Sequence, residues 1–413
     1  MGLPIIFQQK TSLSLRQVLI FGGFMVTMSM GIRHGFGLFN LPITTANGWG
    51  RETFALTIAL QNLIWGAVQP ITGALADRYG ALKIMIAGGI LYAFGLIGMG
   101  LSSEAMNFTI AGGLFIGLAQ TATTYSVIYG VLGRNVAPEK RVWAMGITAA
   151  AGSFGQFLMI PVEQGLITNF GAQDALLFLA LMATLMVPTA YMLREKNFVY
   201  SHKAGEQTIK QALIEAMGNR SFRLLTLGYF VCGFQVVFIA VHLAPYLKDL
   251  SKLYPSVGAP TVATTSLALI GLFNVFGTYF AGFVGQRLPK RFLLSGIYIG
   301  RSIAITLFTL LPLSPMSTYI FAACMGFLWL STVPLTNAIV AQIFGVKYLT
   351  MLSGLVFFSH QLGSFCGAYL GGYFFDQTGS YQLVWQIAIG LGVFAALINL
   401  PVREQAISRV ALV

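Results

Sequence analysis

Five basic side chains interrupt the long apolar stretches of this 413-residue sequence, and their chemistry limits what the protein can bind. They are Arg33, His34, His242, Arg301 and His360. Inside a membrane a charged group is costly, so such residues face a cavity or a polar partner and mark ligand or ion pathways. Arginine keeps its positive charge, whereas histidine gains or loses a proton near neutral pH. Around one cavity, these groups would attract an anion and exchange protons.

Carboxylate groups are missing from the middle of the same apolar stretches. The 12 acidic residues fall in loops or near the ends of the stretches, and Glu163 and Asp376 come closest to the interior. A cavity lined by arginine and histidine without carboxylates favours anions and repels organic cations. The sequence therefore predicts an anionic ligand.

Polar residues in neighbouring stretches complete the predicted ligand site, because hydroxyl and amide groups suit carboxylate recognition. We expect the site to comprise Arg33, His34, Tyr125, Gln235, Asn274, Arg301 and His360. The histidines of this set, His34 and His360, are the predicted proton carriers. Adjacent residues on a helix differ by about 100°, so we expect only one of Arg33 and His34 to face the cavity. Each residue also has a plainer interpretation: Arg301 as a structural pair, the histidines as packing groups and the amides as helix–helix hydrogen bonds.

The elements that carry these residues are membrane-spanning helices. The chain is 56% hydrophobic and 9% charged, with a mean hydropathy of +0.77, whereas a soluble protein carries about 25% charged residues. Nearly uncharged segments recur at the length of about 20 residues that crosses a bilayer, and helices satisfy their own backbone groups in lipid. We predict an all-α membrane protein with twelve spans, at 17–40, 53–75, 84–102, 107–131, 143–167, 172–193, 223–247, 261–285, 292–311, 316–343, 349–375 and 382–401.

Basic residues predict the orientation of these spans, since cytoplasmic loops carry an excess of Lys and Arg. With both termini in the cytoplasm, 19 of the 24 Lys and Arg fall in cytoplasmic segments, three fall outside and two lie within spans. The net charge of +12 is thus spread over many short loops, unlike a nucleic-acid-binding patch. We expect a multi-pass protein of a bacterial inner membrane that contacts lipid, binds no nucleic acid and acts as a monomer.

Motifs for other kinds of chemistry are absent from the sequence. The cysteines Cys232, Cys324 and Cys366 lie in apolar spans and offer neither a disulfide framework nor metal-ligand spacing. No phosphate-binding Gly-x4-Gly-Lys-Ser/Thr loop is present, which argues against coupling to ATP. There is no convincing nucleophile–base pairing and no repeated selectivity filter. The sequence therefore predicts neither an enzyme nor a channel, and no cofactor or metal.

A polar stretch divides the spans into two sets of six. We expect an N-terminal half at 1–193, a cytoplasmic linker at 194–222 with a short helix near 210–217, and a C-terminal half at 223–413. Two motifs recur at nearly equal distances. Gly73-Ala-Leu-Ala-Asp-Arg precedes Gly282-Phe-Val-Gly-Gln-Arg by 209 residues, and Gly152-Ser-Phe precedes Gly363-Ser-Phe by 211 residues. Two such halves around a site at the middle of the membrane are typical of secondary transporters.

The motif Gly73-Ala-Leu-Ala-Asp77-Arg78-Tyr-Gly80, followed by Lys83, resembles the loop between spans two and three of the major facilitator superfamily. The resemblance covers the whole chain. It implies the major facilitator fold, with two pseudo-symmetric six-helix halves, and a gating role for this loop and its copy after span eight. The residues given that gating role are Gly73, Asp77, Arg78, Gly80, Gly282 and Arg287.

A narrower resemblance is to the monocarboxylate-transporter and oxalate/formate-exchanger branch of that superfamily. The sequence at 141–155 is similar to the branch's entry into span five, and Gly372-Tyr-Phe-Phe-Asp376 to its exit from span eleven. The charged pair that the branch carries in span eight is replaced near Asn274 and Thr278. The resemblance implies transport of a small organic anion.

Together these observations predict a secondary transporter that moves a small organic anion, specifically a monocarboxylate, by proton symport or by anion exchange. Its two halves would rock around the site in alternating access. The alternative is an exporter of a larger amphipathic metabolite, drug or siderophore, which the 33 phenylalanines and the uncharged span eight favour.

Overall fold

The regular structure is entirely helical in the residues that the computed structural model describes, which are 13–195, 209–345 and 349–407. The first part of the chain forms α1 (Leu15–Gln17), η1 (Val18–Gly22), α2 (Gly23–His34), α3 (Phe36–Asn47), α4 (Arg51–Tyr79), α5 (Ala81–Leu101), α6 (Ala105–Thr109), η2 (Ile110–Phe115), α7 (Ile116–Thr123), α8 (Tyr125–Asn135), α9 (Pro138–Phe170), α10 (Ala172–Ala183) and α11 (Met186–Met192). The second part forms α12 (Ile209–Gly218), α13 (Arg220–Leu250), η3 (Pro255–Val257), α14 (Pro260–Val284), α15 (Lys290–Leu310), α16 (Pro315–Leu328), α17 (Thr332–Phe344), α18 (Leu349–Thr378) and α19 (Gln382–Asn399). The helix α12 lies where the sequence predicts a short linker helix.

Within the described ranges, eleven helical segments are long and apolar enough to cross a membrane, and they match eleven of the predicted spans. The remaining predicted span is α18, a helix of 30 residues that packs between α4 and α13. It carries Ser359, His360 and Gln361 near its middle. His360 and Gln361 are buried among neighbouring helices, so these polar groups face protein rather than lipid, which is where a membrane helix tolerates them.

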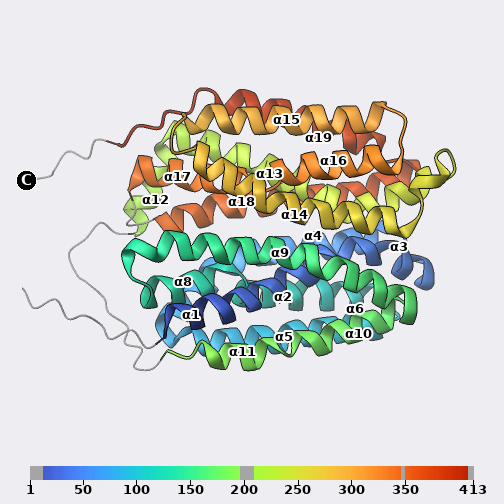
Figure 1. Ribbon diagram of the computed structural model, residues 1–413, viewed down its shortest axis with the longest axis horizontal. Helices are drawn as coiled ribbons and strands as arrows, with labels where there is room; N and C mark the ends of the chain where they lie inside the picture. Colours follow the sequence, from blue (N-terminus) through green and yellow to red (C-terminus); the bar gives the residue numbers. More distant parts are fainter. Residues whose placement is uncertain (1–12, 196–208, 346–348, 408–413) are drawn as a thin grey trace, which may run out of the picture.

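Two layers of helices face each other along the length of the molecule, one built from α1–α11 and the other from α12–α19 (Figure 1). Helices α3 and α4 pack against α13 and α18, and α9 packs against α14. The internal repeat relates span two to span eight and span five to span eleven. The α4–α18 and α14–α9 contacts are therefore equivalent when the layers are exchanged, as a pseudo-symmetric fold requires. The boundaries 1–193, 194–222 and 223–413 stay a prediction, and residues 196–208 lie outside the described residues.

The repeated Gly-Ser-Phe motif lies at corresponding helix contacts in the two layers. A methyl group added at Gly155 of α9 would overlap the carbonyl oxygen of Thr27 on α2. One added at Gly363 of α18 would overlap the carbonyl oxygen of Phe230 on α13. Small residues let membrane helices approach this closely. The repeat in the sequence, together with Gly155 directly after its first copy, thus marks a close helix contact in each layer.

Four spans are interrupted in the described residues: span six breaks at an exposed position, 184–185, between α10 and α11, and three others break inside the bundle. Span one changes from α2 to α3 at Gly35, span four has an extended residue at Thr124 between α7 and α8, and span ten is broken at 329–331 between α16 and α17. Thr124 is buried, as are Trp329 and Ser331. Irregular backbone at membrane depth persists only where protein surrounds it, so these breaks mark positions at which side chains must supply hydrogen bonds.

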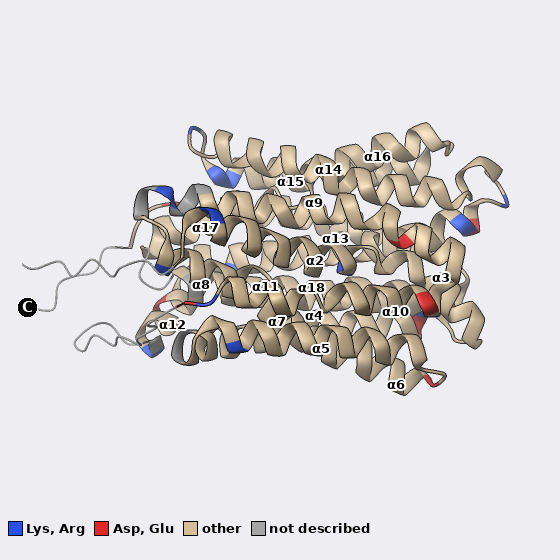
Figure 2. Ribbon diagram, turned by 60° about the horizontal axis from the view of Figure 1, so that its bottom comes forward, with Lys and Arg blue, Asp and Glu red and all other residues tan. Residues whose placement is uncertain are grey.

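Charged residues gather at the two ends of the bundle. Figure 2 shows most of the Lys and Arg at the end where α8, α12 and α17 lie, with fewer at the opposite end near α3. The first and last described residues lie at the basic end (Figure 1). Under the predicted orientation this basic end is cytoplasmic, and that orientation stays a prediction.

Candidate functional site

A small cavity between the two layers contains the charged groups of span one. Its walls include Arg33, His34, Phe36 and Ile58 from one layer and Val236 and Val241 from the other. The cavity has about 20 Å³ of open space, which is room for a single water molecule. We expected only one of the adjacent pair to face a cavity, but both line it. The regular helix is interrupted directly after this pair, since α2 ends at His34 and α3 begins at Phe36.

Arg33 presents an unused donor beside this cavity. Its Nη2 donates to Oδ1 of Asn62, and its guanidinium carbon lies 5.1 Å from the centroid of the Trp65 ring. Asn62 is itself fixed, because its Nδ2 donates to the carbonyl oxygen of Ile58 at 2.7 Å. The Nε of Arg33 is buried without a partner, and none of the described carboxylates forms an ion pair with this residue. A guanidinium in this state is suited to bind an anion.

A row of side chains leads from Arg33 across the interface to His360. Arg33 lies over Trp65 of α4, whose ring centroid is 5.2 Å from that of Phe357 on α18. Phe357 in turn stacks on His360, with centroids 5.9 Å apart and planes inclined by 10°. The Nε1 of Trp65 donates to Oε1 of Gln69 at 2.8 Å, which fixes the indole. The sequence did not single out Trp65 or Phe357, since aromatic residues are frequent in every span.

The two predicted proton carriers have different surroundings. The Nδ1 of His34 lies 2.6 Å from the carbonyl oxygen of Met30, so Nδ1 is the donor and Nε2 is left to accept a proton. The Nδ1 of His360 lies 3.1 Å from Oε1 of Gln361. Its Nε2 is buried and has no hydrogen-bond partner among the residues described. Proton transfer by either histidine stays a prediction.

Arg301 and Gln235 belong to a polar cluster inside the second layer. Arg301 is 0% exposed, and its Nε and Nη2 donate to the carbonyl oxygen of Leu328 at 3.1 and 2.7 Å. Nη2 also donates to the carbonyl oxygen of Trp329. The break in span ten frees these carbonyl groups, so Arg301 replaces the missing helical hydrogen bonds. Gln235 accepts from Arg301 Nη1 at 3.4 Å and donates to the carbonyl oxygen of Ala388 at 2.9 Å.

Asn274 and Tyr125 also lie away from the cavity walls. The Nδ2 of Asn274 donates to Oγ of Ser153 at 2.9 Å and joins α14 to α9 across the interface. Its Oδ1 accepts from the backbone N–H of Leu330 at 3.0 Å, again at the break in span ten. Tyr125 begins α8, and its hydroxyl lies against Gly152. Substrate contact by these residues stays a prediction.

The predicted gating loop after span two is the junction of α4 and α5. Gly80 separates the two helices with φ 88°, a backbone conformation that favours glycine. Nothing packs around the Cα of Gly73 within 4 Å. The side chains of Asp77 and Arg78 lie outside the described residues, so their ionic contacts stay a prediction.

The second copy of that loop follows α14. The space around Gly282 is open. The guanidinium carbon of Arg287 lies 4.6 Å from the centroid of the Phe283 ring. Arg287 therefore stacks on its own helix, and its predicted gating role stays untested by this contact.

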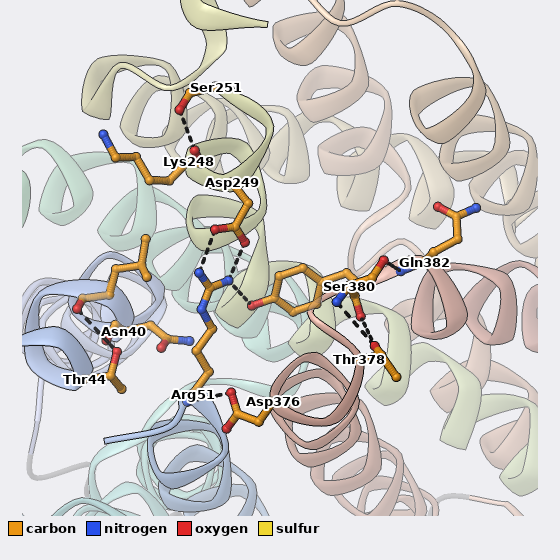
Figure 3. Close-up of polar contacts among 12 residues, drawn as sticks. Asn40, Thr44, Arg51, Lys248, Asp249, Ser251, Asp376, Thr378, Ser380 and Gln382 are labelled. Atoms are coloured by element: carbon orange, nitrogen blue, oxygen red, sulfur yellow. Dashed lines mark hydrogen bonds and ion pairs between the residues drawn. The ribbon is translucent and has the colours of Figure 1, made fainter. Parts of the chain in front are cut away.

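Arg51 joins the two layers at the end opposite the chain termini (Figure 3). Its Nη1 and Nη2 lie 2.6 and 2.7 Å from the carboxylate oxygens of Asp249 on α13. Nη1 also donates to the hydroxyl of Tyr381 at 2.9 Å, and the guanidinium carbon lies 3.7 Å from the Phe375 ring centroid. Burial raises the pKa of Tyr381, so this hydroxyl stays protonated. We call Arg51, Asp249 and Tyr381 the latch, since together they connect α4 to the other layer.

Glu163 lies seven residues before the end of α9, and its burial is what the sequence does not predict. It is 0% exposed on α9, and neither carboxyl oxygen has a hydrogen-bond partner within the described part of the chain. The helix continues to Phe170, beyond the predicted end of the span, so Glu163 lies about 10 Å inside it. Its carboxyl group contacts Gly35, where span one bends. A buried carboxyl group therefore contacts the glycine that directly follows the Arg33 and His34 pair.

Comparisons with known proteins agree with this architecture. The model of the Major Facilitator Superfamily matches residues 19–340. The uncharacterized MFS-type transporter YcxA of Bacillus subtilis (strain 168) is 24% identical over 409 residues, covering 95% of this chain and 96% of the relative. Monocarboxylate transporter 13 of Rattus norvegicus is 24% identical over 396 residues, covering 92% of this chain and 87% of that protein.

Two further matches extend the comparison. The oxalate:formate antiporter of Oxalobacter formigenes is 22% identical over 368 residues, covering 86% of this chain and 83% of the relative. A bacterial homologue of the human lysosomal transporter Spinster, solved in an inward-facing and occupied conformation, superimposes with a TM-score of 0.73. That structure is 14% identical and covers 92% of this chain and 95% of its own, so it supports the fold alone. From the family match and the two-layered helical fold we conclude that this chain belongs to the Major Facilitator Superfamily of transporters.

Proposed function

We propose that this protein is a secondary active transporter that moves a small organic anion of the monocarboxylate class. It works as a monomer in a bacterial inner membrane, with both termini in the cytoplasm. The two layers rock around the space between Arg33 and His360 and open it to one side at a time.

The state of Arg33 carries this proposal. It is a permanent cation at the interface of the layers, it has an unpaired buried Nε, and no described carboxylate pairs with it. A buried charge without a counterion is costly, and a substrate carboxylate would supply the counterion and a bidentate hydrogen-bond acceptor. Arg301 is fully buried, but its carbonyl partners already use its donors. We therefore assign Arg33 to the anion and Arg301 to the support of span ten.

The aromatic pair formed by Trp65 and Phe357 suits a role in closing the site. The cavity beside Arg33 has about 20 Å³ of open space, which admits one water molecule rather than an organic anion. Entry of a monocarboxylate requires Trp65 of α4 and Phe357 of α18 to separate. The anion would then lie between Arg33 on one layer and His360 on the other, so its binding would favour the layers closing around it.

The names of the relatives support the substrate class. One is a monocarboxylate transporter and another is an oxalate:formate antiporter, and all of these substrates carry carboxylate groups. Two coupling modes fit this class: symport with a proton and exchange of one anion for another. For symport, His34 and His360 are the proton carriers that the sequence proposes.

Uptake into proteoliposomes tests the substrate class and the coupling mode together. Purified protein would be reconstituted and given labelled formate, acetate, lactate, pyruvate or oxalate. One set of vesicles has an imposed inward proton gradient, and the other contains the same unlabelled anion. We expect saturable uptake of at least one monocarboxylate under one of these conditions. Uptake that collapses with a protonophore indicates symport, and uptake that requires internal anion indicates exchange.

Arg33→Gln provides the matching test of the site. Loss of one charge-assisted hydrogen bond corresponds to about 1.5–3 kcal/mol, so the apparent affinity for the anion should fall by about 10- to 100-fold. Lys248→Gln is the control, because it removes the same charge from an exposed position. Absence of uptake across the whole panel would refute the monocarboxylate assignment, and efflux of a larger amphipathic compound would then favour the exporter.

A further inference from the structure

A fully buried carboxyl group in a membrane span needs a physical explanation, and Glu163 has none in the contacts around it. Its side chain is 0% exposed. Neither Oε1 nor Oε2 accepts or donates a hydrogen bond in the ranges that the structure describes. An ionised carboxylate without partners in such surroundings is one of the most costly groups that a protein can bury. In this conformation the group must therefore hold a proton.

The position of Glu163 connects it to the candidate anion site. Its carboxyl group lies against Gly35, so closely that a methyl group at Gly35 would overlap it. Gly35 separates α2 from α3 and directly follows Arg33 and His34, which line the cavity between the layers. Any change in the bend of span one thus moves the surroundings of the carboxyl group and of the anion site together.

The ionisable groups around Glu163 come mainly from one side. On α2 they are Arg33 and His34, while α3 carries none. Asp174 at the start of α10 is exposed, where water screens its charge. Tyr125 of α8 contacts Gly152 of α9, about three helical turns from Glu163.

Helix α14 also packs against α9, and its tyrosine lies far from Glu163. Asn274 of α14 bonds Ser153 of α9, ten residues before Glu163, and Tyr279 follows farther along α14 and is 76% exposed. Tyr92 of α5 interacts electrostatically with both Glu163 and Arg33, and its hydroxyl donates to the carbonyl oxygen of Ser29 at 2.9 Å. The basic groups nearest to Gly35 in the chain are Arg33 and His34. A carboxylate formed at Glu163 would be attracted to the cation that we assign to the substrate.

We propose that Glu163, in place of His34 and His360, is the proton-binding site of this transporter, and that its protonation alternates with the opening of the anion site. This inference rests on the proposed function, because Glu163 would supply the proton for symport of a monocarboxylate. When the site is closed and dry, the carboxyl group is neutral. When the layers part and water reaches the bend at Gly35, the proton leaves, and the carboxylate competes with the substrate anion for the positive charge of Arg33.

The charge balance of one cycle follows from this arrangement. A monocarboxylate brings one negative charge to Arg33, and the proton on Glu163 brings one positive charge. The loaded carrier therefore crosses with no net charge added, and the symport is electroneutral. Without the proton, the closed state would contain both a bound anion and a buried carboxylate, so the closed form would be disfavoured. This is the physical basis for obligatory coupling.

Glu163→Gln separates coupling from transport. The amide keeps the shape of the neutral acid but cannot release a proton. In proteoliposomes we expect exchange of labelled for unlabelled monocarboxylate to stay within about 3-fold of the unmodified protein, while accumulation driven by a proton gradient falls to the level of protein-free vesicles. Glu163→Asp should retain gradient-driven accumulation. Asp174→Asn is the control for loss of an acidic group and should behave as the unmodified protein.

The outcomes distinguish this inference from the proposed function. Unmodified protein that moves no monocarboxylate refutes the proposed function and removes the basis of the inference. Unmodified protein that exchanges anions but never accumulates them with a proton gradient overturns the inference and leaves the proposed function intact. The same holds if Glu163→Gln accumulates the anion as well as the unmodified protein does.

A second measurement does not depend on the folding of the glutamine variant. A protonated carboxyl group has a carbonyl stretching band that an ionised one lacks, and infrared spectroscopy of the unmodified protein at neutral pH should contain it. The band should shift in Glu163→Asp and persist in Asp174→Asn. Absence of the band from the unmodified protein at neutral pH would overturn the proposal.

Discussion

Replacing Arg51 by glutamine should loosen the closed end of the protein that faces away from the termini. The Arg51 guanidinium belongs to α4, while Asp249 belongs to α13 and Tyr381 precedes α19. When the two layers separate at this end, these latch contacts must break. The backbone N–H groups of Arg51 and Glu52 donate to Asp376 of α18 at 3.1 and 2.8 Å, and a side-chain substitution leaves those bonds in place.

The size of the effect follows from the exposure of the partners. The Arg51 and Asp249 side chains are 11% and 35% exposed, so water screens the pair, and we assign it about 1 kcal/mol, the upper end for exposed ion pairs. The hydrogen bond to Tyr381 and the packing on Phe375 add about 1 kcal/mol. A total of roughly 2 kcal/mol corresponds to a shift of roughly 30-fold in the population of the open form.

Thiol accessibility measures that population. Val241 is 3% exposed and lines the cavity between the layers, so Val241→Cys should react with a membrane-impermeant maleimide only when this end opens. The native cysteines are first replaced by alanine; they are Cys232, Cys324 and Cys366. Arg51→Gln should raise the labelling rate from outside by roughly 30-fold. Asp249→Asn should raise it by about 5-fold, since only the ion pair is lost.

The double variant tests whether the two residues act on each other. With Arg51 already replaced, Asp249→Asn should add nothing, because its partner is absent. Lys252→Gln removes a charge from an exposed residue at the same end and should leave the rate unchanged. Equal rates in Arg51→Gln and Lys252→Gln would refute the latch. Rate increases that multiply in the double variant would show that Asp249 does not act through Arg51.

Two further predictions concern stability, measured as the midpoint of thermal unfolding in detergent. Arg301→Met leaves the carbonyl groups at the break of span ten without donors and should lower the free energy of unfolding by about 3 kcal/mol. Arg287→Met is the control and should change the midpoint little. Equal midpoints for the two variants would exclude a structural role for Arg301. Gly155→Ala places a methyl group against the backbone oxygen of Thr27 and should lower the midpoint. Gly165→Ala places its methyl group in open space and should leave the midpoint unchanged. An equal fall in the midpoint for both variants would contradict the close packing of α2 on α9.

Local sequence patterns predict the spans because hydropathy depends on neighbouring residues alone. They also place Arg33 and His34 at the site, since a charge in an apolar helix requires a cavity or partner. Contacts between segments that are distant in the sequence could not be predicted in this way. Trp65 and Phe357 belong to spans two and eleven, and nothing in either sequence shows that they meet. Aromatic residues are so frequent in this chain that a pattern of them carries no information about which pair closes the interface.

The burial of Glu163 has a geometric cause. The apolar stretch loses its hydrophobicity near 167, but α9 continues to Phe170 and Gly35 of span one packs against the carboxyl group. For Arg301 the sequence left a structural and a functional interpretation open. The carbonyl groups that it bonds are those of Leu328 and Trp329, which only the break in span ten makes accessible.

Arg33 and Arg301 show why residue type alone does not assign a role inside a membrane protein. Both are arginines in spans, and neither has a carboxylate partner among the described residues. Arg301 is coordinated by fixed carbonyl oxygens within one layer, so its surroundings stay the same when the layers rock. Arg33 lies at the interface with an unpaired Nε, two residues before Gly35, which Glu163 contacts. Under the proposed mechanism its compensating charge changes with conformation: the substrate when Glu163 is protonated, and Glu163 itself when it is not. A charge whose partner alternates in this way couples a proton to an anion without any direct contact between the two.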